Sequence, residues 1–339
     1  MGLNTKKLDK KRVLIAGGYG EIGSHIARHI RNVYPDIELI LTGRNPDKGK
    51  PLATELGGVE LATLDLQKPF NLADFGQIDL VIASLLDPAD ALIEQAWEHG
   101  INYISMTRLV NELTSLLLHT LQKPSHSTVV LADHWQVGIA TLIAKNAAAA
   151  FSKIDSIEVS ALYDETDPIG PMVIEQLDSF HGPSLLRKDG KWMWLSGEDN
   201  AKTLTLFNGE QVNASPLAAL DATSLAAITG AKNVRFDFAV GKSIGTQKGE
   251  IASHDVYIDI EGTLPSGAPG RTRTLVSGTK GQSSMTGLGA MLMMEGVLGL
   301  AGQTSPEQGK IYLPETLLTN PIDLERLKTF GIQTSTEIL

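Results

Sequence analysis

The first half of the chain alternates short apolar runs with amphipathic stretches. Six apolar runs are predicted strands, at residues 12–16, 37–42, 59–66, 78–84, 102–106 and 128–132. The run at 78–84 is apolar almost throughout, which is typical of a parallel strand covered on both faces. The stretches between the runs show helical spacing, as in Ile22, Ile26 and Ile30. This alternation predicts a doubly wound parallel sheet with helices packed against it.

The pattern changes after His134. Residues 138–151 are rich in alanine and predict a helix. Short strand-like segments follow at residues 156–163, 185–195, 204–207, 234–240, 254–261 and 271–277. Asp189-Gly190 and Asn208-Gly209 are turns typical of antiparallel hairpins. The second half is therefore expected to be an α+β domain of mainly antiparallel sheet.

Helical spacing returns at residues 283–300 and 323–330. A chain of 339 residues is long enough for two domains. We expect a doubly wound domain over residues 1–135, an α+β domain for substrate binding or dimerisation over residues 136–282, and C-terminal helices over residues 283–339 that pack back on the first domain.

A glycine-rich turn follows the first predicted strand. Its glycines have the spacing G-x-G-x-x-G, between an apolar strand and an amphipathic helix. In a dinucleotide-binding Rossmann domain such glycines allow a tight turn, a close approach of the backbone to a pyrophosphate, and close packing of helix on strand. The N–H groups of the first helical turn then face the phosphates. The sequence therefore predicts a dinucleotide site, with a purely structural turn as the alternative. The residues assigned to it are Gly18, Tyr19, Gly20, Glu21, Ile22 and Gly23.

The end of the second predicted strand indicates which dinucleotide to expect. An NAD site usually has Asp or Glu there to accept a hydrogen bond from the ribose 2′-hydroxyl, whereas an Arg suits a 2′-phosphate. Here the chain has Gly43, Arg44 and Asn45, and Glu38, the only acid of the strand, lies at its start. Gly43 leaves room, and Arg44 supplies a planar charged fork. We therefore expect NADP(H), unless Arg44 is only a solvated loop charge.

Other strand ends are also predicted to border the cofactor. In an open α/β sheet the ligand lies outside the C-terminal ends of the strands. An acid after the third strand can accept from the adenine amino group, although a turn or helix-capping Asp fits the pattern equally well. The positions expected at these ends are Asp65, Leu66, Ser84, Leu85 and Ser105.

Net charge and residue composition limit the classes of binding partner that are expected. The formal net charge is −10, whereas nucleic acids and anionic membranes require clustered Lys and Arg. We therefore expect a small-molecule substrate and no nucleic acid. The chain has no cysteine, which excludes disulfides, thiolate metal sites and a cysteine nucleophile. No His-x-x-x-His or Glu-x-x-His pair lies on a helical pattern, so no metal site is predicted.

No membrane or secretory segment is predicted. Residues 1–11 are polar and rich in lysine, without the apolar core of a signal peptide. The most apolar later run, residues 287–301, is shorter than a membrane span and contains Glu295. We therefore expect a cytoplasmic protein.

Segments from both ends of the chain share their pattern with one known family. They are the glycine turn at residues 17–23, the second-strand end at 42–45, the helix-ending glycine and tyrosine-bearing strand at 96–104, and the segments 312–315 and 324–332. On these residues the chain resembles the saccharopine dehydrogenase-like family of NADP-binding oxidoreductases. It departs from the family at two positions. Relatives often carry Asp where this chain has Ser105, and Pro-Gly where it has Val137-Gly138.

The resemblance implies oxidation or reduction at a carbon–nitrogen bond of an amino acid, imine or polyamine derivative. Such chemistry needs a proton donor for the nitrogen. His134 lies at a predicted strand end, and an unperturbed imidazole titrates near neutral pH, so we predict it as the proton-transfer group. Tyr163 is the next candidate. The alternative for His134 is a structural role at the crossover between the domains.

The alternative function is an NADP(H)-binding sensor or regulatory protein that transfers no hydride. A short-chain dehydrogenase is not expected, because no Tyr of the chain is followed by Lys four residues later. Trp192 and Trp194 lie on one face of a predicted strand, and pairing of exposed sheet edges around them predicts a homodimer. The alternatives for the two tryptophans are core packing and a substrate platform.

Overall fold

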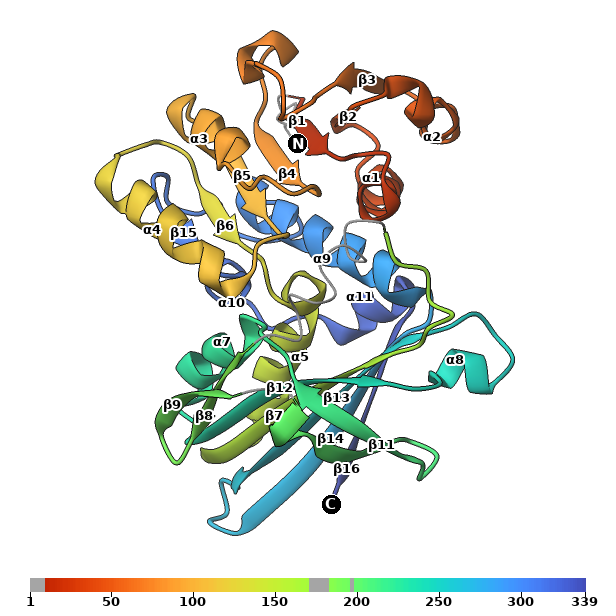
Figure 1. The fold of residues 1–339 in the computed structure, drawn as a ribbon, viewed down its shortest axis with the longest axis vertical. Coiled ribbons are helices and arrows are strands. Elements are labelled where there is room, and N and C mark those ends of the chain that lie inside the picture. Colours follow the sequence, from red (N-terminus) through yellow and green to blue (C-terminus); the bar gives the residue numbers. More distant parts are fainter. Residues whose placement is uncertain (1–9, 171–182, 196–197) are drawn as a thin grey trace, which may run out of the picture.

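The computed structural model describes residues 10–170, 183–195 and 198–339. Figure 1 shows two β-sheets, one above the other, with helix α9 (Gly281–Leu298) between them. Residues 1–9, on which much of the argument against a signal peptide rests, lie outside the described residues.

The first sheet has seven strands among the described residues, all parallel, in the order β15-β6-β5-β4-β1-β2-β3. The strands are β1 (Arg12–Ala16), β2 (Glu38–Gly43), β3 (Val59–Thr63), β4 (Leu80–Ala83), β5 (Asn102–Ser105), β6 (Val129–Leu131) and β15 (Ile311–Tyr312). The strand order reverses between β1 and β4, which is where an open α/β sheet binds its ligand. The predicted doubly wound parallel sheet is confirmed.

Helices cover both faces of this sheet. Besides α9 they are α1 (Glu21–Val33), α2 (Lys50–Leu56), α3 (Ala91–Glu98) and α4 (Leu113–Gln122), with the short 3-10 turns η1 (Pro46–Gly49), η2 (Leu72–Phe75) and η3 (Val110–Glu112). Val13 and Ile15 of β1 pack in the core that contains α1 and α9, whereas Leu14 packs in the core that contains α3 and α4. Because both faces are buried, the strands have nearly continuous apolar sequences.

The second sheet is mixed, and nine strands of it lie in the part of the chain that the structure describes. They are β7 (Lys153–Tyr163), β8 (Ser184–Lys188), β9 (Lys191–Leu195), β10 (Lys202–Thr205), β11 (Gln211–Pro216), β12 (Asn233–Val240), β13 (His254–Thr263), β14 (Pro269–Gly278) and β16 (Ile332–Ile338). The pairing of β12 with β7 is parallel, and the other pairings of this sheet are antiparallel. The β8–β9 hairpin turns at Asp189 and Gly190, whose φ angles of 50° and 79° are the left-handed values that an Asp-Gly turn predicts.

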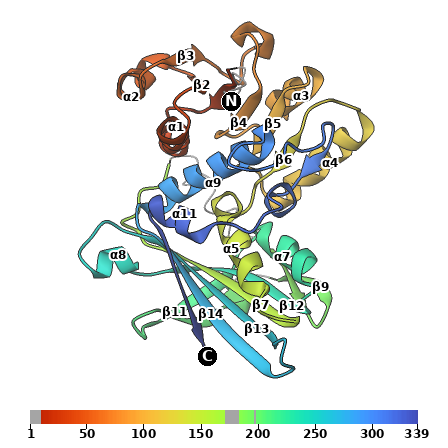
Figure 2. The same cartoon turned by 180° about the vertical axis from the view of Figure 1, so that it is seen from behind.

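The other helices in the described part of the chain pack mainly around the second sheet and the crossover to it. They are α5 (Ile139–Ala148), α7 (Asp221–Thr229), α8 (Ile244–Gln247), α10 (Pro314–Leu317) and α11 (Leu324–Thr329), with the 3-10 turns η4 (Trp135–Gly138) and η5 (Glu198–Asn200). Helices α5 and α7 cover one face of the sheet (Figure 2). None of the described helices combines the length and apolar character needed to cross a membrane.

Trp192 and Trp194 lie on β9, which pairs only with β8 among the described strands. Their exposed fractions are 44% and 58%, so they are not core residues of this chain. The homodimer expected from them stays a prediction.

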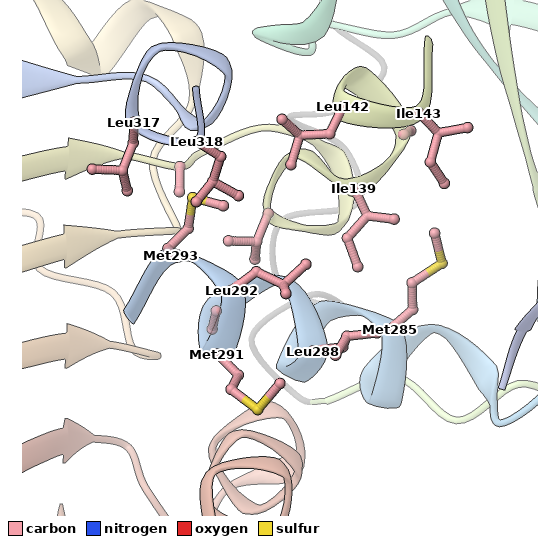
Figure 3. Close-up of a cluster of buried hydrophobic side chains, with 14 of the residues drawn as sticks. Ile139, Leu142, Ile143, Met285, Leu288, Met291, Leu292, Met293, Leu317 and Leu318 are labelled. Carbon is pink, nitrogen blue, oxygen red and sulfur yellow. The ribbon is translucent and has the colours of Figure 1, made fainter. Parts of the chain in front are cut away.

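Helix α9 is buried along nearly its whole length. Figure 3 shows Leu288 and Leu292 of α9 in one cluster with Ile139 of α5 and with Leu317 and Leu318 at the end of α10. A helix that is apolar on all sides is typical of a core element. The helical layer between the two sheets is therefore continuous core, and the two domains share it.

The C-terminal segment divides between the two sheets. β15 extends the first sheet beside β6, whereas β16 pairs with β14 in the second sheet. The expectation that residues 283–339 return to the first domain as helices is therefore wrong for β16. Its sequence is mostly polar and exposed, so this edge strand lacks the apolar alternation that would have predicted it.

A buried carboxylate ties α9 to α1 and α11. Glu295 is 2% exposed, and its Oε1 accepts a hydrogen bond of 2.7 Å from the Tyr34 hydroxyl. The Arg326 guanidinium donates to both carboxylate oxygens, at 2.7 Å to Oε2. An ionised group removed from water needs such a partner, because its lost hydration is otherwise uncompensated.

We expect Arg326→Ala to lower the free energy of unfolding by on the order of 3 kcal/mol, because it leaves the Glu295 carboxylate buried without its cation. Arg28→Ala is the control, since Arg28 pairs with Glu55 on the surface, where both side chains are more than 40% exposed. Arg28→Ala should lower the free energy of unfolding by less than about 1 kcal/mol. Urea unfolding of both variants measures the difference, and equal losses would contradict a special role of the buried pair.

Candidate functional site

The glycine turn between β1 and α1 is held by close backbone contacts. Gly17 has a φ of 78°, which only glycine adopts without strain, so the tight turn lies one residue before the predicted first glycine. A Cβ on Gly23 would lie 2.1 Å from the Gly17 oxygen. Gly23 therefore lets α1 approach its strand, as the spacing predicts.

Gly20 has fewer protein atoms around its Cβ position than the other glycines of the turn. The nearest protein atom to a Cβ on Gly20 would be the Gly17 oxygen, at 3.2 Å. Gly20 is also the N-cap of α1, and no side chain caps this helix end. The first N–H groups of α1, those of Glu21 and Ile22 among them, thus remain available to an anion. An open glycine followed by an uncapped helix N-terminus fits the pyrophosphate of a dinucleotide.

The end of β2 is more crowded than the sequence suggests. The ring of Tyr19 fills the space beside Gly43, where a Cβ would lie 2.6 Å from the Tyr19 Cζ and Oη atoms. The room predicted at Gly43 is thus taken by the protein itself. Arg44 and Asn45 are exposed, and the Asn45 side chain caps η1 by accepting a 3.1 Å hydrogen bond from the Asp47 amide.

The end of β3 contains a local turn. The Asp65 Oδ1 atom accepts a 3.2 Å hydrogen bond from the Gln67 amide, and its Oδ2 lies 3.4 Å from the Lys68 ammonium. These contacts match the turn that the sequence left open as an alternative to adenine binding. Leu66 packs against the core cluster on the α3 side of the sheet.

The ends of β4 and β5 lie beside the glycine turn. The Ser84 amide donates to the Ala16 oxygen at 2.9 Å, and a Cβ on Gly17 would collide with the Ser84 carbonyl. The Leu85 carbonyl accepts from the Thr107 hydroxyl at 2.9 Å. The Ser105 hydroxyl donates to Asp133 at 2.8 Å. The strand ends named from the sequence are thus held close to one another and to the turn.

One cavity of about 170 Å³ joins these strand ends to the second sheet. Ser84, Asp133 and His134 line it from the first domain, and Tyr163 and Phe238 from the second. Much of the remaining wall is apolar. It includes Ile22, Met106, Leu109, Val137, Ile169 and Leu217. A mostly apolar cleft with a few polar groups at the switch point of the sheet is the usual form of a ligand site.

Asp133 is the ionisable group at the end of β6 that sequence reasoning passed over. Its Oδ1 accepts 2.8 Å hydrogen bonds from the Ser105 hydroxyl and the Arg108 amide, whereas its buried Oδ2 has no partner among the described residues. Burial raises the pKa of the Asp133 carboxyl to about 6, although these hydrogen bonds and the Arg108 charge oppose the shift. The sequence did contain a signal for this residue, because Asp133 directly follows a predicted buried strand and precedes His134.

Arg108 brings a cation to the same cavity. Its side chain is 8% exposed, and Nη1 donates to the Asp90 carboxylate. Nη2 lies 3.8 Å from Asp87 and makes no hydrogen bond within the described chain. Buried polar atoms nearly always make hydrogen bonds, so Arg108 and Asp133, each with a buried atom that makes none within the described residues, are suited to a polar ligand.

His134 lies in a different environment from the one that its predicted role requires. Its side chain is fully buried, and Nε2 lies 2.7 Å from the Ser224 hydroxyl of α7 and 3.7 Å from the Glu315 carboxylate of α10. Burial lowers the pKa of the imidazole to about 3, so the ring is neutral at working pH. The contacts favour the alternative of a structural role at the crossover over proton donation.

Tyr163 lies at the end of β7 on the cavity wall, and its ring stacks on Phe238 with the centroids 5.9 Å apart. Burial raises the pKa of its hydroxyl, and the acids Asp167, Glu165 and Asp164 raise it further. The phenol therefore remains protonated at working pH and can donate a proton.

The crossover η4 has a strained backbone next to the cavity. Gln136 and Val137 have φ angles of 51° and 55°, and a β-branched residue rarely adopts such values. The Trp135 amide donates to Asp221 at 2.7 Å, and the Gln136 side chain accepts from Thr286 of α9. Strain of this kind persists only where surrounding contacts over-determine the backbone, which is common at functional sites.

Comparison with known proteins establishes the fold. No family model matches the chain, and no curated protein matches it in sequence. Among solved structures, apo saccharopine dehydrogenase (L-Glu forming) from Saccharomyces cerevisiae is similar with a TM-score of 0.72 and 13% identity, over 97% of this chain and 100% of that one. Homospermidine synthase from Legionella pneumophila, in complex with NAD, is similar with a TM-score of 0.65 and 13% identity, over 99% of this chain and 93% of that one.

Both similarities extend over nearly the whole chain, so they include the glycine turn, the crossover and the second sheet. The structural likeness that the sequence resemblance implied is thereby confirmed. The chain has the fold of saccharopine dehydrogenase.

Proposed function

We propose that the protein is an NADP(H)-dependent oxidoreductase that acts on a carbon–nitrogen bond of an amino acid, imine or polyamine derivative. The observation that carries this proposal is the cavity at the switch point, which connects the glycine turn with Asp133, Arg108 and Tyr163. The fold of saccharopine dehydrogenase supports it, and so does the NAD in the structure of homospermidine synthase. The preference for NADP(H) rests on this chain's own residues.

The first domain would hold the cofactor by its phosphates. The open face of Gly20 accommodates the pyrophosphate, and the uncapped N-terminus of α1 stabilises its charge. Arg44, exposed at the end of β2, would bind the 2′-phosphate. When bound, the nicotinamide supplies or accepts the hydride.

The cavity's unpaired polar atoms favour a substrate that carries nitrogen and a carboxylate. The Asp133 Oδ2 atom can accept a hydrogen bond from an amine, and the Arg108 Nη2 atom can donate to a carboxylate. A buried polar atom without a partner is costly, so a ligand that pairs both atoms gains affinity. The structural arrangement thus supports a substrate of the amino-acid type.

Proton transfer to the substrate nitrogen is assigned to Tyr163. Its phenol lines the cavity and stays protonated, whereas the imidazole of His134 is neutral and bonded to Ser224. The apolar wall around them excludes water, which strengthens the electrostatic interactions of Asp133 and Arg108. We therefore retain Tyr163 as the catalytic acid and propose Asp133 in place of His134 as the second ionisable group.

The alternative function, an NADP(H)-binding sensor, is favoured by the burial of His134 and by Ser105, where relatives often carry Asp. A sensor would bind NADPH tightly but show no turnover with a broad panel of amines and carbonyl compounds. Oxidation of NADPH with any imine would decide for the enzyme.

We expect Gly20→Val to abolish NADPH binding and leave the protein folded. The extended backbone of Gly20 suits valine, and the Gly17 oxygen, 3.2 Å from the new Cβ, need shift only by a few tenths of an ångström. The branched side chain would occupy the space left for the pyrophosphate. Gly23→Val is the contrasting variant, because its Cβ would strike the Gly17 oxygen and should destabilise the fold itself. Fluorescence titration with NADPH and thermal unfolding separate the two effects. Unchanged affinity in Gly20→Val would leave the glycines a structural turn.

Arg44→Ala should remove most of a preference for NADPH over NADH. A charge-assisted contact to the 2′-phosphate contributes on the order of 1–3 kcal/mol. Lys48→Ala, which removes another exposed cation from the neighbouring η1, controls for long-range attraction and should have a small effect. Both dinucleotides are titrated by fluorescence, and equal affinities in the unmutated protein would contradict the NADP(H) assignment.

Asp133→Asn should change how stability depends on pH. The Asp133 pKa of about 6 lies above the unfolded value, so the folded chain binds more protons between these two pKa values and the carboxyl lowers stability as pH rises through this window. The variant should therefore gain on the order of 2 kcal/mol relative to the unmutated protein between about pH 4 and about pH 7. Asp36→Asn, at an exposed position, is the control. Parallel urea-unfolding profiles for Asp133→Asn and the unmutated protein would contradict the raised pKa.

A further inference from the structure

The ring of Tyr19 occupies a space at the end of β2 that is bordered by Gly43 and Gly49, and we call this space the Tyr19 seat. A Cβ on Gly43 would lie 2.6 Å from its Cζ and Oη atoms, and a Cβ on Gly49 would lie 2.8 Å from its Cδ1. Neither glycine has a positive φ, so neither is needed for the conformation of the backbone. The Tyr19 ring leaves no room for a side chain at Gly43. At Gly49 it does so together with the Leu61 Cδ2 atom, which would lie 2.7 Å from a Cβ.

Gly43 is the position from which a dinucleotide site normally reads the adenosine ribose. It lies at the C-terminal end of β2, twenty positions after Gly23, the last glycine of the turn. An acid about that far along accepts a hydrogen bond from the ribose 2′-hydroxyl in NAD sites. In this chain the phenol of Tyr19 takes the place of that acid's side chain.

The Tyr19 hydroxyl is available for a ligand. Its oxygen is buried and makes no hydrogen bond with the described residues. Burial raises the pKa of the phenol, and the Asn45 backbone and the Arg44 charge oppose the shift. Arg44 and Asn45 directly follow Gly43, whose Cβ position lies 2.6 Å from the phenol oxygen. Arg44 is exposed and can reorient without disturbing the core. A phenol O–H and a guanidinium are both hydrogen-bond donors, and such donors are suited to an oxyanion.

We propose that Tyr19 determines the choice of dinucleotide, with its hydroxyl and Arg44 together binding the 2′-phosphate. This inference rests on the proposed NADP(H) function and identifies a specificity residue for it. A phosphate oxygen accepts from the phenol and the guanidinium at once. NAD(H) lacks this phosphate, and Gly43 offers no carboxylate to accept from its 2′-hydroxyl.

Tyr19→Phe tests the hydroxyl and keeps the ring in its seat. NADPH affinity should fall on the order of tenfold, as expected for a hydrogen bond to a charged group, and NADH affinity should stay unchanged. Isothermal titration with each dinucleotide measures both, without a substrate or turnover. Tyr34→Phe, which removes a phenol hydroxyl bonded to Glu295 in the core, is the matched control and should leave the ratio of the two affinities unaltered.

A reciprocal exchange tests the seat itself. Gly43→Asp alone should reduce the binding of both dinucleotides, because the new side chain collides with the Tyr19 ring. Tyr19→Ala combined with Gly43→Asp frees this space for the acid and should reverse the preference towards NADH. Loss of NADPH preference in Tyr19→Phe and its reversal in the double variant support the inference.

Failure of this inference can be told apart from failure of the proposed function. If the unmutated protein prefers NADPH and Tyr19→Phe keeps the same ratio of affinities, the role of Tyr19 is overturned and the function stands. If the unmutated protein binds neither dinucleotide, both are overturned.

Discussion

The close approach of α9 to the backbones around it determines the geometry of the molecule. A Cβ on Gly287 would lie 2.8 Å from the His25 Cβ of α1, and one on Gly289 would lie 2.6 Å from the Gln136 oxygen of the crossover. Two glycines near the middle of one buried helix thus let it contact the helix that carries the glycine turn and the segment that connects the domains. The first turn of α9 contributes Gln282 and Ser283 to the cavity wall. Since packed interiors deform little, α9 fixes the turn, the crossover and the cavity relative to one another.

The polar groups near the cavity differ in how many of their atoms make hydrogen bonds. At the crossover, Asp221 accepts from the Trp135 amide at 2.7 Å and from the Thr141 hydroxyl at 2.6 Å, and His134 is bonded to Ser224. These contacts compensate the strained backbone of η4 and make it a rigid joint. At the strand ends, by contrast, Asp133 and Arg108 are each anchored on one side and left unpaired on the other. Rigid support behind incompletely paired groups is the arrangement that binding and catalysis require.

The sequence predicted those features whose cause is local. Buried parallel strands need continuous apolar runs, and the turn between β1 and α1 needs glycine at fixed spacing, so the first sheet and the glycine turn were both predicted. The polar edge strand β16 leaves no such pattern, because its register comes from β14. The local sequence also does not show which side chains tertiary contacts will enclose. His134 and Asp133 are adjacent, yet α7 and α10 enclose the His134 side chain, whereas Asp133 keeps an oxygen without a hydrogen bond among the described residues. The seat of Tyr19 depends on Gly49, six residues beyond Gly43 and on another element.

The two kinds of selectivity proposed here lie at opposite ends of a bound dinucleotide. Tyr19, Gly43 and Arg44 belong to the turn and to β2, whereas Asp133, Arg108 and Tyr163 belong to the crossover side and the second sheet. Interaction energies between groups that share no partners are close to additive, so a substitution at β2 should leave the substrate pocket unaffected. Helix α9 is the exception, because it contacts both α1 and the crossover. Binding at the turn and the geometry of the cavity can therefore influence each other through α9, as they can through Ile22 of α1 and Ser84, which line the cavity beside the turn.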